Sequence, residues 1–179
     1  MYLSKKTYVK KWGHEKPEES FDVSVKKGGV SFPDIKTERV SYVTEEVMYW
    51  RKANQIHGWF CNNCEELTPE VSYLVTRENL EELLDVCKKT IEILDKSTKT
   101  SKKVVSGWSG GKEMMTDIDV YDTEDVLELL PPTQGFFYGS DTIDDWYRKD
   151  IEDTIKMLEE ELSIPKIGWG ASYEYYASW

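Results

Sequence analysis

The sequence predicts an α+β fold, in which a small antiparallel sheet from the N-terminal third and the C-terminal tail packs on about three long helices. Apolar and polar residues alternate in "MYLSKKTYV" and "FDVSVKK", as is typical of half-buried strands. Between residues 80 and 94 the apolar positions instead recur at helical spacing. A chain of 179 residues is long enough to bury a core, so we expect one domain, residues 1–179.

The remaining strand signals lie near the two ends of the chain. "KKGGV" places two glycines in a turn after the second alternating run, and "ERVSYV" is a further short strand candidate. The tail "IGWGASYEYYASW" is rich in aromatic residues, which favour strands, so we expect it to return to the sheet.

The first helix is expected to begin at Thr44. Threonine is a good N-cap, and Glu45 and Glu46 follow in the first turn, where the helix dipole favours carboxylates. This helix would end near Asn62 and Asn63.

The later helices follow from similar signals. Thr76 is expected to cap a helix with one buried stripe, and Thr123 to start a short helix that "LPP" stops. A third long helix is expected at about 142–162, and residues 96–121 are expected to form an inserted hairpin or a mobile segment. The stripe of the second helix consists of Leu80, Leu83, Leu84, Cys87, Ile91 and Leu94.

Charge is spread unevenly and limits the classes of partner. The chain has 23 basic and 34 acidic residues, a net charge of −11, and residues 113–162 hold 16 acids against 3 bases. Nucleic-acid binding needs a basic surface, so we expect no nucleic-acid partner. The acidic segment is either a solvated face or a surface that imitates nucleic acid or docks on a basic protein.

Membrane and secretion signals are not expected to act in this chain. No window approaches the length of a transmembrane segment, and "MYLSKKTYVKKW" lacks the apolar region of a signal peptide. Three cysteines are too few for a secreted disulfide framework. We therefore expect a cytoplasmic protein with no membrane partner.

The stretch "YWRKANQIHGWFCNNC" (49–64) is the first candidate site. On a helix, Trp50, Asn54 and His57 would share one narrow band, with Arg51 beside it and the apolar core face on the other side. Trp50 would stack on a flat ring, Arg51 would grip a phosphate or carboxylate, and Asn54 would read amide-like edges. The alternative is that these side chains only pack and satisfy one another.

A metal site and an enzyme are weaker interpretations. His57, Cys61 and Cys64, with Cys87 from the next helix, can be drawn as a zinc site, but Cys87 fits the buried stripe and only one CxxC pair exists. No phosphate-binding loop, nucleophile elbow or HExxH motif occurs. We therefore expect no metal, no cofactor and no catalytic residue, although a small enzyme acting on a nucleotide stays an alternative.

The loop "TQGFFYGSDT" (133–142) is the second candidate site. Its glycines permit unusual backbone angles around the aromatic residues, and the helix that follows offers free N–H groups to an anion. Phe137, Tyr138 and Ser140 are its candidate ligand-binding residues, unless the phenylalanines only fill the core.

The motifs "YWRKANQIHGWF" and "LPPTQGFFYGS", with "MYLSKKTYVKKW", "DDWYRKDIEDTI" and the final "ASW", resemble a family of uncharacterised proteins of phages and prophages. The resemblance covers the chain outside about 96–121, with patterns like YWRKANxIHxWF and LPxTxGFFxGS. It implies a phage-encoded protein in the host cytoplasm, where such small proteins often counter host defence.

Together these observations predict a non-enzymatic protein that sequesters a small anionic ligand of the nucleotide type. The main alternative is an acidic inhibitor or nucleic-acid mimic that caps a host defence enzyme. A homo-oligomer stays open, because some proteins of this kind bury their ligand between subunits.

Overall fold

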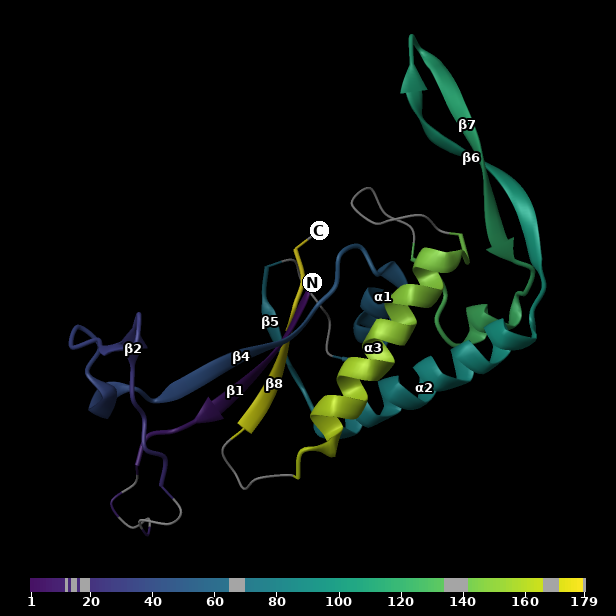
Figure 1. The fold of residues 1–179 in the computed structure, drawn as a ribbon. Coiled ribbons are helices and arrows are strands. Elements are labelled where there is room, and N and C mark those ends of the chain that lie inside the picture. Colours follow the sequence, from purple (N-terminus) through teal and green to yellow (C-terminus); the bar gives the residue numbers. More distant parts are fainter. Residues whose placement is uncertain are drawn as a thin grey trace.

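A four-stranded antiparallel sheet and two long helices form the body of the protein in the computed structural model (Figure 1). The structure describes residues 1–11, 13, 16, 20–64, 70–133, 142–165 and 171–178. The sheet has the order β4-β1-β8-β5, with β1 (Tyr2–Tyr8), β4 (Tyr42–Tyr49), β5 (Ser72–Val75) and β8 (Ala171–Tyr176). Strands from both ends of the chain share this sheet and helices pack on it, so the expected α+β class is confirmed.

The first and last strands lie in the middle of the sheet, next to each other. Leu3 of β1 pairs in register with Tyr175 of β8, and both side chains are buried. Residues alternate between the two faces of a strand, so this register directs both side chains toward the helices. The strands expected at the N-terminus and in the tail are therefore confirmed.

The helix expected from Thr44 is wrong, because residues 42–49 form strand β4. This strand pairs with β1 and places Thr44 opposite Lys6 and Glu45 opposite Lys5. Unlike charges on neighbouring strands attract each other, and the segment is rich in β-branched and aromatic residues. Pairing with β1 therefore outweighs the capping signal, and the helix begins ten residues later, at Asn54.

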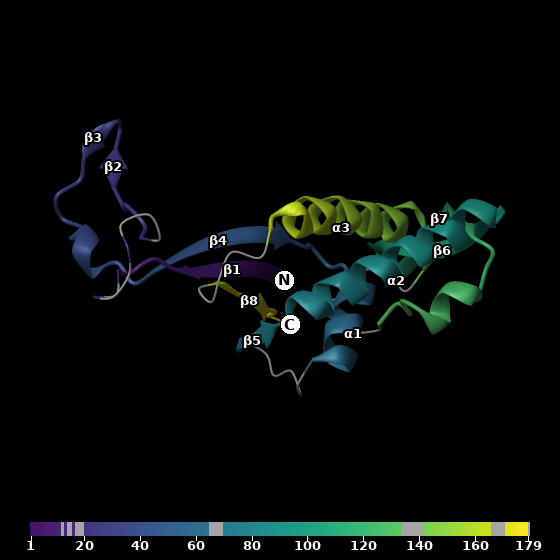
Figure 2. The same cartoon turned by 90° about the horizontal axis from the view of Figure 1, so that it is seen from below.

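Two long helices lie against one end of the sheet and run antiparallel to each other (Figure 2). They are α2 (Arg77–Lys96) and α3 (Asp145–Ser163). Two ion pairs link the helices in this alignment, because Lys88 lies 2.7 Å from Glu159 and Arg148 lies 2.8 Å from Asp95.

The start of α2 agrees with the sequence and the start of α3 differs slightly. The Thr76 side chain accepts from the Asn79 N–H in a capping box, as expected for the second helix. Helix α3 begins at Asp145 rather than at about 142, and its cap is Asp144, whose carboxylate accepts from the Trp146 and Tyr147 N–H groups. The short helix expected after Thr123 is a 3₁₀ turn, η3 (Asp125–Glu128).

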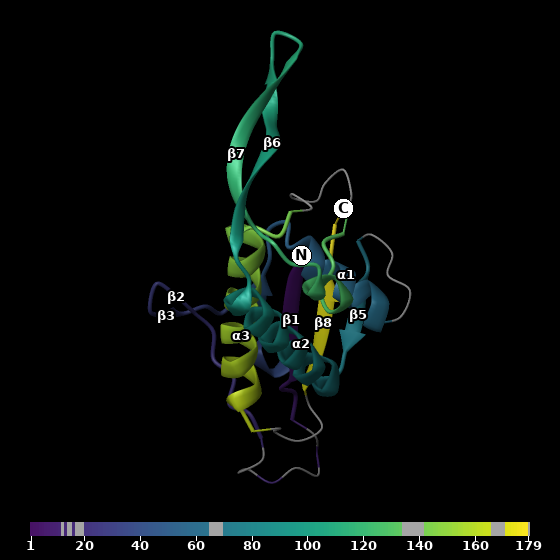
Figure 3. The same cartoon turned by 90° about the vertical axis from the view of Figure 1, so that its right-hand side faces the viewer.

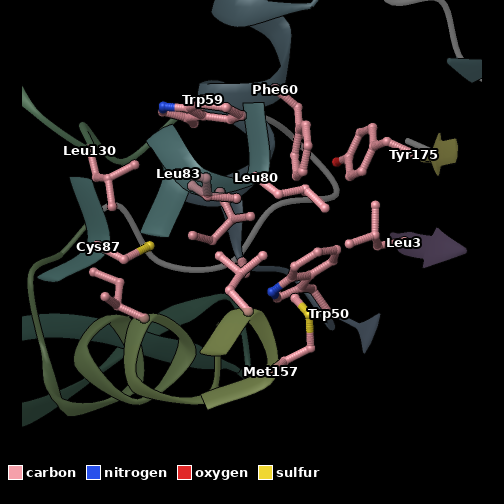
Figure 4. Packing of buried hydrophobic residues seen from close by; sticks show 14 of the residues in the cluster. Leu3, Trp50, Trp59, Phe60, Leu80, Leu83, Cys87, Leu130, Met157 and Tyr175 are labelled. Carbon is pink, nitrogen blue, oxygen red and sulfur yellow. The ribbon is translucent and has the colours of Figure 1, made fainter. Parts of the chain in front are cut away.

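Helix α1 (Asn54–Asn63) lies inside the molecule, between the sheet and α2 and α3. All seven of its first residues, 54–60, are buried. Figure 4 shows Phe60 of this helix against Tyr175, with Trp50 close to Leu3 and Met157. The Phe60 and Tyr175 rings are stacked, with centroids 4.0 Å apart and an interplanar angle of 17°.

Two hairpins project from opposite ends of the body (Figures 1 and 3). Strand β2 (Lys26–Lys27) meets β3 (Val30–Ser31) through Gly28 and Gly29, which have φ of 59° and 82°. The glycine turn is thus confirmed, but the strand expected over "FDVSVKK" is only two residues long. Near it lies a second 3₁₀ turn, η2 (Thr37–Arg39), and the long hairpin consists of β6 (Lys99–Ser109) and β7 (Lys112–Tyr121).

None of the helices in the described ranges combines the length and apolar character needed to cross a bilayer.

Gly58 marks a close approach between α1 and the segment that follows η3, and it supplies a stability test. A Cβ at position 58 would lie 2.3 Å from Thr133 Oγ1, so Gly58→Ala should lower the free energy of unfolding by about 1–3 kcal/mol. Urea unfolding of the wild type and the variant measures this loss.

Thr133→Ala provides the matched background, because it removes Oγ1 and keeps the backbone N–H that Asn54 Oδ1 accepts. In that background Gly58→Ala should be neutral or stabilising, since alanine is favoured over glycine in helices by about 1 kcal/mol. An equal loss in both backgrounds would contradict the contact.

Candidate functional site

Three of the side chains expected to line a pocket are instead sealed in the core. Trp50, Asn54 and His57 are each 2% exposed. The Trp50 indole N–H donates to Thr154 Oγ1 of α3 at 2.8 Å, and its backbone exchanges hydrogen bonds with Met1. The expectation that they would lie partly open beside a cavity is wrong for these three residues, which hold elements together.

The polar atoms of α1 are satisfied from inside the protein. Asn54 accepts from the Thr133 N–H at 3.3 Å, and Gln55 donates to the Tyr147 carbonyl at 3.4 Å. His57 Nδ1 lies 2.8 Å from the Tyr175 hydroxyl. Buried polar groups are costly unless they are paired, so these contacts make the polar face of α1 compatible with burial.

Arg51 differs from its neighbours, because it is exposed and borders an open groove of about 480 Å³. The groove separates the end of β4 and the turn after it from the first turns of α3. Its lining residues are Met48, Tyr49, Trp50, Arg51, Lys52, Trp146, Asp150 and Asp153.

The turn after β4 presents two adjacent cations to this groove. Lys52 has φ of 64°, in the left-handed region that non-glycine residues rarely adopt. Such a conformation persists only where the surrounding structure holds it. The buried Trp50 before it and the buried Ala53 after it hold this turn, so Arg51 and Lys52 remain at the surface.

An indole ring borders the same groove from α3. Trp146 is 73% exposed and follows Asp145, the first residue of the helix. A large aromatic side chain at a solvent-facing position is unusual for a helix whose other aromatic residue, Tyr147, is buried. The ring therefore offers an accessible flat surface near the two cations.

The third component is a pair of carboxylates, Asp150 one helical turn and Asp153 two helical turns after Trp146. Partial burial raises the pKa of Asp150 to about 6, helped by the negative charges of Asp153 and Asp144 and opposed by a hydrogen bond from Gln55 and the charge of Lys149. Asp153 is more open and lies 2.7 Å from Lys149. The groove thus has cations on one wall and carboxylates on the other.

Sequence reasoning and the structure select partly different residues. The structure places Trp50 and Arg51 beside the groove, but Trp50 is almost completely buried, and Asn54 and His57 lie in the core. Phe137, Tyr138 and Ser140 lie outside the described residues. Sequence reasoning missed Lys52, Trp146 and Asp150. A signal for Trp146 was present, because it stands directly before Tyr147 in "DDWYRKDIEDTI", and adjacent residues point in different directions on a helix with one buried face.

The three cysteines occupy different environments. Cys61 is exposed, Cys64 is half-buried and Cys87 is buried among the apolar residues of α2. Within the described ranges, no three His, Cys, Asp or Glu side chains are arranged to hold a metal ion.

Comparison of the chain with models of protein families, with curated proteins and with solved structures yields no match.

The raised pKa of Asp150 predicts a pH-dependent stability. The folded protein holds this proton more tightly than the unfolded chain, whose pKa is near 3.8, so the stabilisation present below pH 4 is lost as pH rises through about 6. Asp150→Asn should therefore gain about 1 kcal/mol over the wild type at pH 7.5, since solvent in the groove screens the charge. At pH 3.5 the two should agree. Urea unfolding at both pH values measures the difference.

Asp153→Asn is the control, because it removes a more exposed carboxylate from the same groove. Its effect should stay within about 0.5 kcal/mol at either pH. A gain for Asp150→Asn that does not change with pH would contradict the burial argument.

The expected absence of a metal has its own test. Protein purified without added metal should contain well under one zinc per chain by elemental analysis. Stoichiometric zinc that is lost in Cys61→Ser or Cys64→Ser would show that a site assembles.

Proposed function

We propose that the protein binds a small anionic ligand of the nucleotide type in the groove between the β4 turn and α3, and sequesters it without chemical change. The observation that carries this proposal is the placement of Arg51 and Lys52 beside the exposed ring of Trp146. In the biological setting that the phage resemblance suggests, this protein counters host defence from the host cytoplasm.

Each part of the groove has a role in such a complex. Arg51 supplies the planar fork that matches two phosphate oxygens, and Lys52 adds a second positive charge. Trp146 stacks on the base, a contact worth about 1–3 kcal/mol per base.

The carboxylates set the orientation of the ligand. Asp150 and Asp153 repel phosphate, so the anionic end lies toward Arg51 and Lys52. The opposite wall then accepts N–H or O–H donors of a base or a ribose. A ligand with an anionic end, a flat ring and a donor-rich edge matches this distribution, and nucleotides have all three.

The absence of chemical change is supported by the groove lining. None of the described residues that line the groove carries an imidazole or a thiol, and His57 is hydrogen-bonded inside the core. An imidazole base or a thiol nucleophile is therefore not offered to a ligand there, and Asp150, whose pKa is raised to about 6, is the carboxylate of the described lining that suits a general base.

The second candidate function is capping of a host enzyme, and the long hairpin favours it. Strands β6 and β7 expose apolar side chains, including Trp108 at 68%, Met114 and Met115. Exposed apolar side chains of this size often mark protein contacts.

Imitation of nucleic acid is less well supported, because five of the 16 acids of residues 113–162 form ion pairs among the described residues. Lysine and arginine side chains pair with Asp145, Glu152, Asp153, Glu159 and Glu161.

Titration calorimetry with ADP, GDP, 3′,5′-cyclic AMP and cyclic di-AMP tests the groove. At least one should bind, and Arg51→Ala or Trp146→Ala should weaken binding about tenfold or more, with a nearly unchanged melting temperature because both side chains are exposed. Lys112→Ala, at the tip of the long hairpin, removes one charge far from the groove and should bind as the wild type does. A lower melting temperature with unchanged affinity would contradict the assignment.

A reconstituted host defence reaction separates the two candidate functions. Sequestration predicts that signal synthesis continues and that the intact signal is recovered by mass spectrometry when the protein is denatured. Blocked synthesis with no signal recovered would favour capping. The rate at which the protein associates with the enzyme should then fall steeply as salt rises, because exposed charges steer association.

A further inference from the structure

A chain of three side chains connects the core of the protein to its surface on the side of α1. His57 Nδ1 lies 2.8 Å from the Tyr175 hydroxyl, and His57 Nε2 lies 3.4 Å from Cys61 Sγ. Tyr175 and His57 are buried, whereas Cys61 is exposed. A buried imidazole therefore contacts an accessible thiol on one side and a phenol on the other.

The fold holds this arrangement rigidly. His57 and Cys61 are one helical turn apart, so their side chains lie on the same face of α1. Tyr175 comes from a central strand, and its ring stacks on both Phe60 and His57. A nucleophile, a base and a group that orients the base are the three parts of an activated nucleophile.

His57 and Cys61 are both neutral at rest, and the directions of both pKa shifts disfavour a resting thiolate–imidazolium pair. The contact between Nε2 and Sγ therefore serves to take the proton only as the sulfur attacks. Burial and the positive charge of the amino terminus lower the pKa of His57, so its imidazole is neutral near pH 7. Burial raises the pKa of Cys61, so its sulfur keeps the proton until a base removes it. We assign the proton of the neutral His57 ring to Nδ1, which donates it to the Tyr175 oxygen. In this tautomer Nε2, on the side of Cys61, carries no proton.

We propose that Cys61 is a nucleophilic thiol that His57 activates and that exchanges with small disulfides, with Cys64 as the resolving thiol. In the first step His57 Nε2 takes the Cys61 proton, and the sulfur attacks one sulfur of the disulfide. The S–S bond of the small molecule breaks, one thiolate leaves with the proton from His57, and a mixed disulfide remains on Cys61.

Cys64 is placed to complete the exchange. It ends α1 three residues after Cys61, which separates the two Cα atoms by about 5 Å. Disulfides span Cα distances of about 4.4–6.8 Å. The Cys64 sulfur attacks the Cys61 sulfur and releases the second small thiol, so two protein thiols are oxidised while one disulfide is reduced.

Alkylation tests the activation of Cys61. With limiting iodoacetamide at pH 7.5, peptide mass spectrometry should show Cys61 labelled about tenfold or more faster than Cys64, and buried Cys87 should stay unlabelled as a control for unfolding. His57→Asn should reduce the Cys61 rate to that of Cys64. Tyr175→Phe keeps the ring and removes only the hydroxyl, and it should reduce the rate in a fold that is otherwise preserved.

Equal rates for Cys61 and Cys64 in the wild type would overturn the proposal, as would a Cys61 rate that neither variant changes. If His57→Asn labels Cys87 and is therefore unfolded, Tyr175→Phe decides the matter.

Oxidised glutathione tests the exchange itself. The wild type should lose two thiols and gain no mass from glutathione, because Cys64 resolves the adduct. Cys64→Ser should accumulate one glutathione on Cys61, and Cys61→Ser should form neither product at a comparable rate. Two results would contradict the assignment. One is glutathione bound to Cys64 of the wild type, and the other is a protein that reacts with oxidised glutathione no faster than the reduced peptide 54–64 does.

Discussion

The structure depends on the enclosure of helix α1, a ten-residue helix that is buried on all sides over its first seven residues. Its contact with the sheet is the stacked pair of Phe60 and Tyr175, and its contact with the segment after η3 is so close that a Cβ at position 58 would lie 2.3 Å from Thr133 Oγ1. A helix in this position has no solvent face to receive polar side chains. Each amide, imidazole and indole near it must therefore find a partner inside the protein.

This constraint explains why chemically versatile residues cluster on α1, a helix that does not line the groove. Asn54, Gln55 and His57 are used to connect α1 to α3, to β8 and to the segment around residue 133. The turn before the helix then directs Arg51 and Lys52 outward, where Trp146 faces the same groove. The groove and the core network are two consequences of one buried helix.

The sequence predicts the elements whose signals are local and leaves out those decided by pairing. Thr76 and the stripe from Leu80 to Leu94 define α2, because a cap and a one-sided stripe need no information from elsewhere. Thr44 also has the form of a cap, but β1 offers it a hydrogen-bonded neighbour, and a long-range pairing of this kind is invisible in a window of sequence.

The candidate site was predictable in part for the same reason. Arg51 was selected because its guanidinium suits an anion, although the sequence placed it on a helix and the structure places it in the turn between β4 and α1. The burial of Trp50 depends on Thr154, more than a hundred residues away, and the exposure of Trp146 depends on where α3 crosses the end of β4. Helical periodicity also fails for α1, since a helix that is enclosed has no contrast between its faces.

The long hairpin gives the protein a mechanical arm. Strand β6 has eleven residues, a reach of about 35 Å, and among the described residues the arm meets the body at its base. There Tyr121 N–H donates to the Ile143 carbonyl, Val120 bridges to Asp144, and Lys99 lies 2.6 Å from Asp145. These attachments end at the first turn of α3, next to Trp146. A force that acts on the tip of the hairpin therefore exerts a torque on the first turn of α3, which forms one wall of the groove.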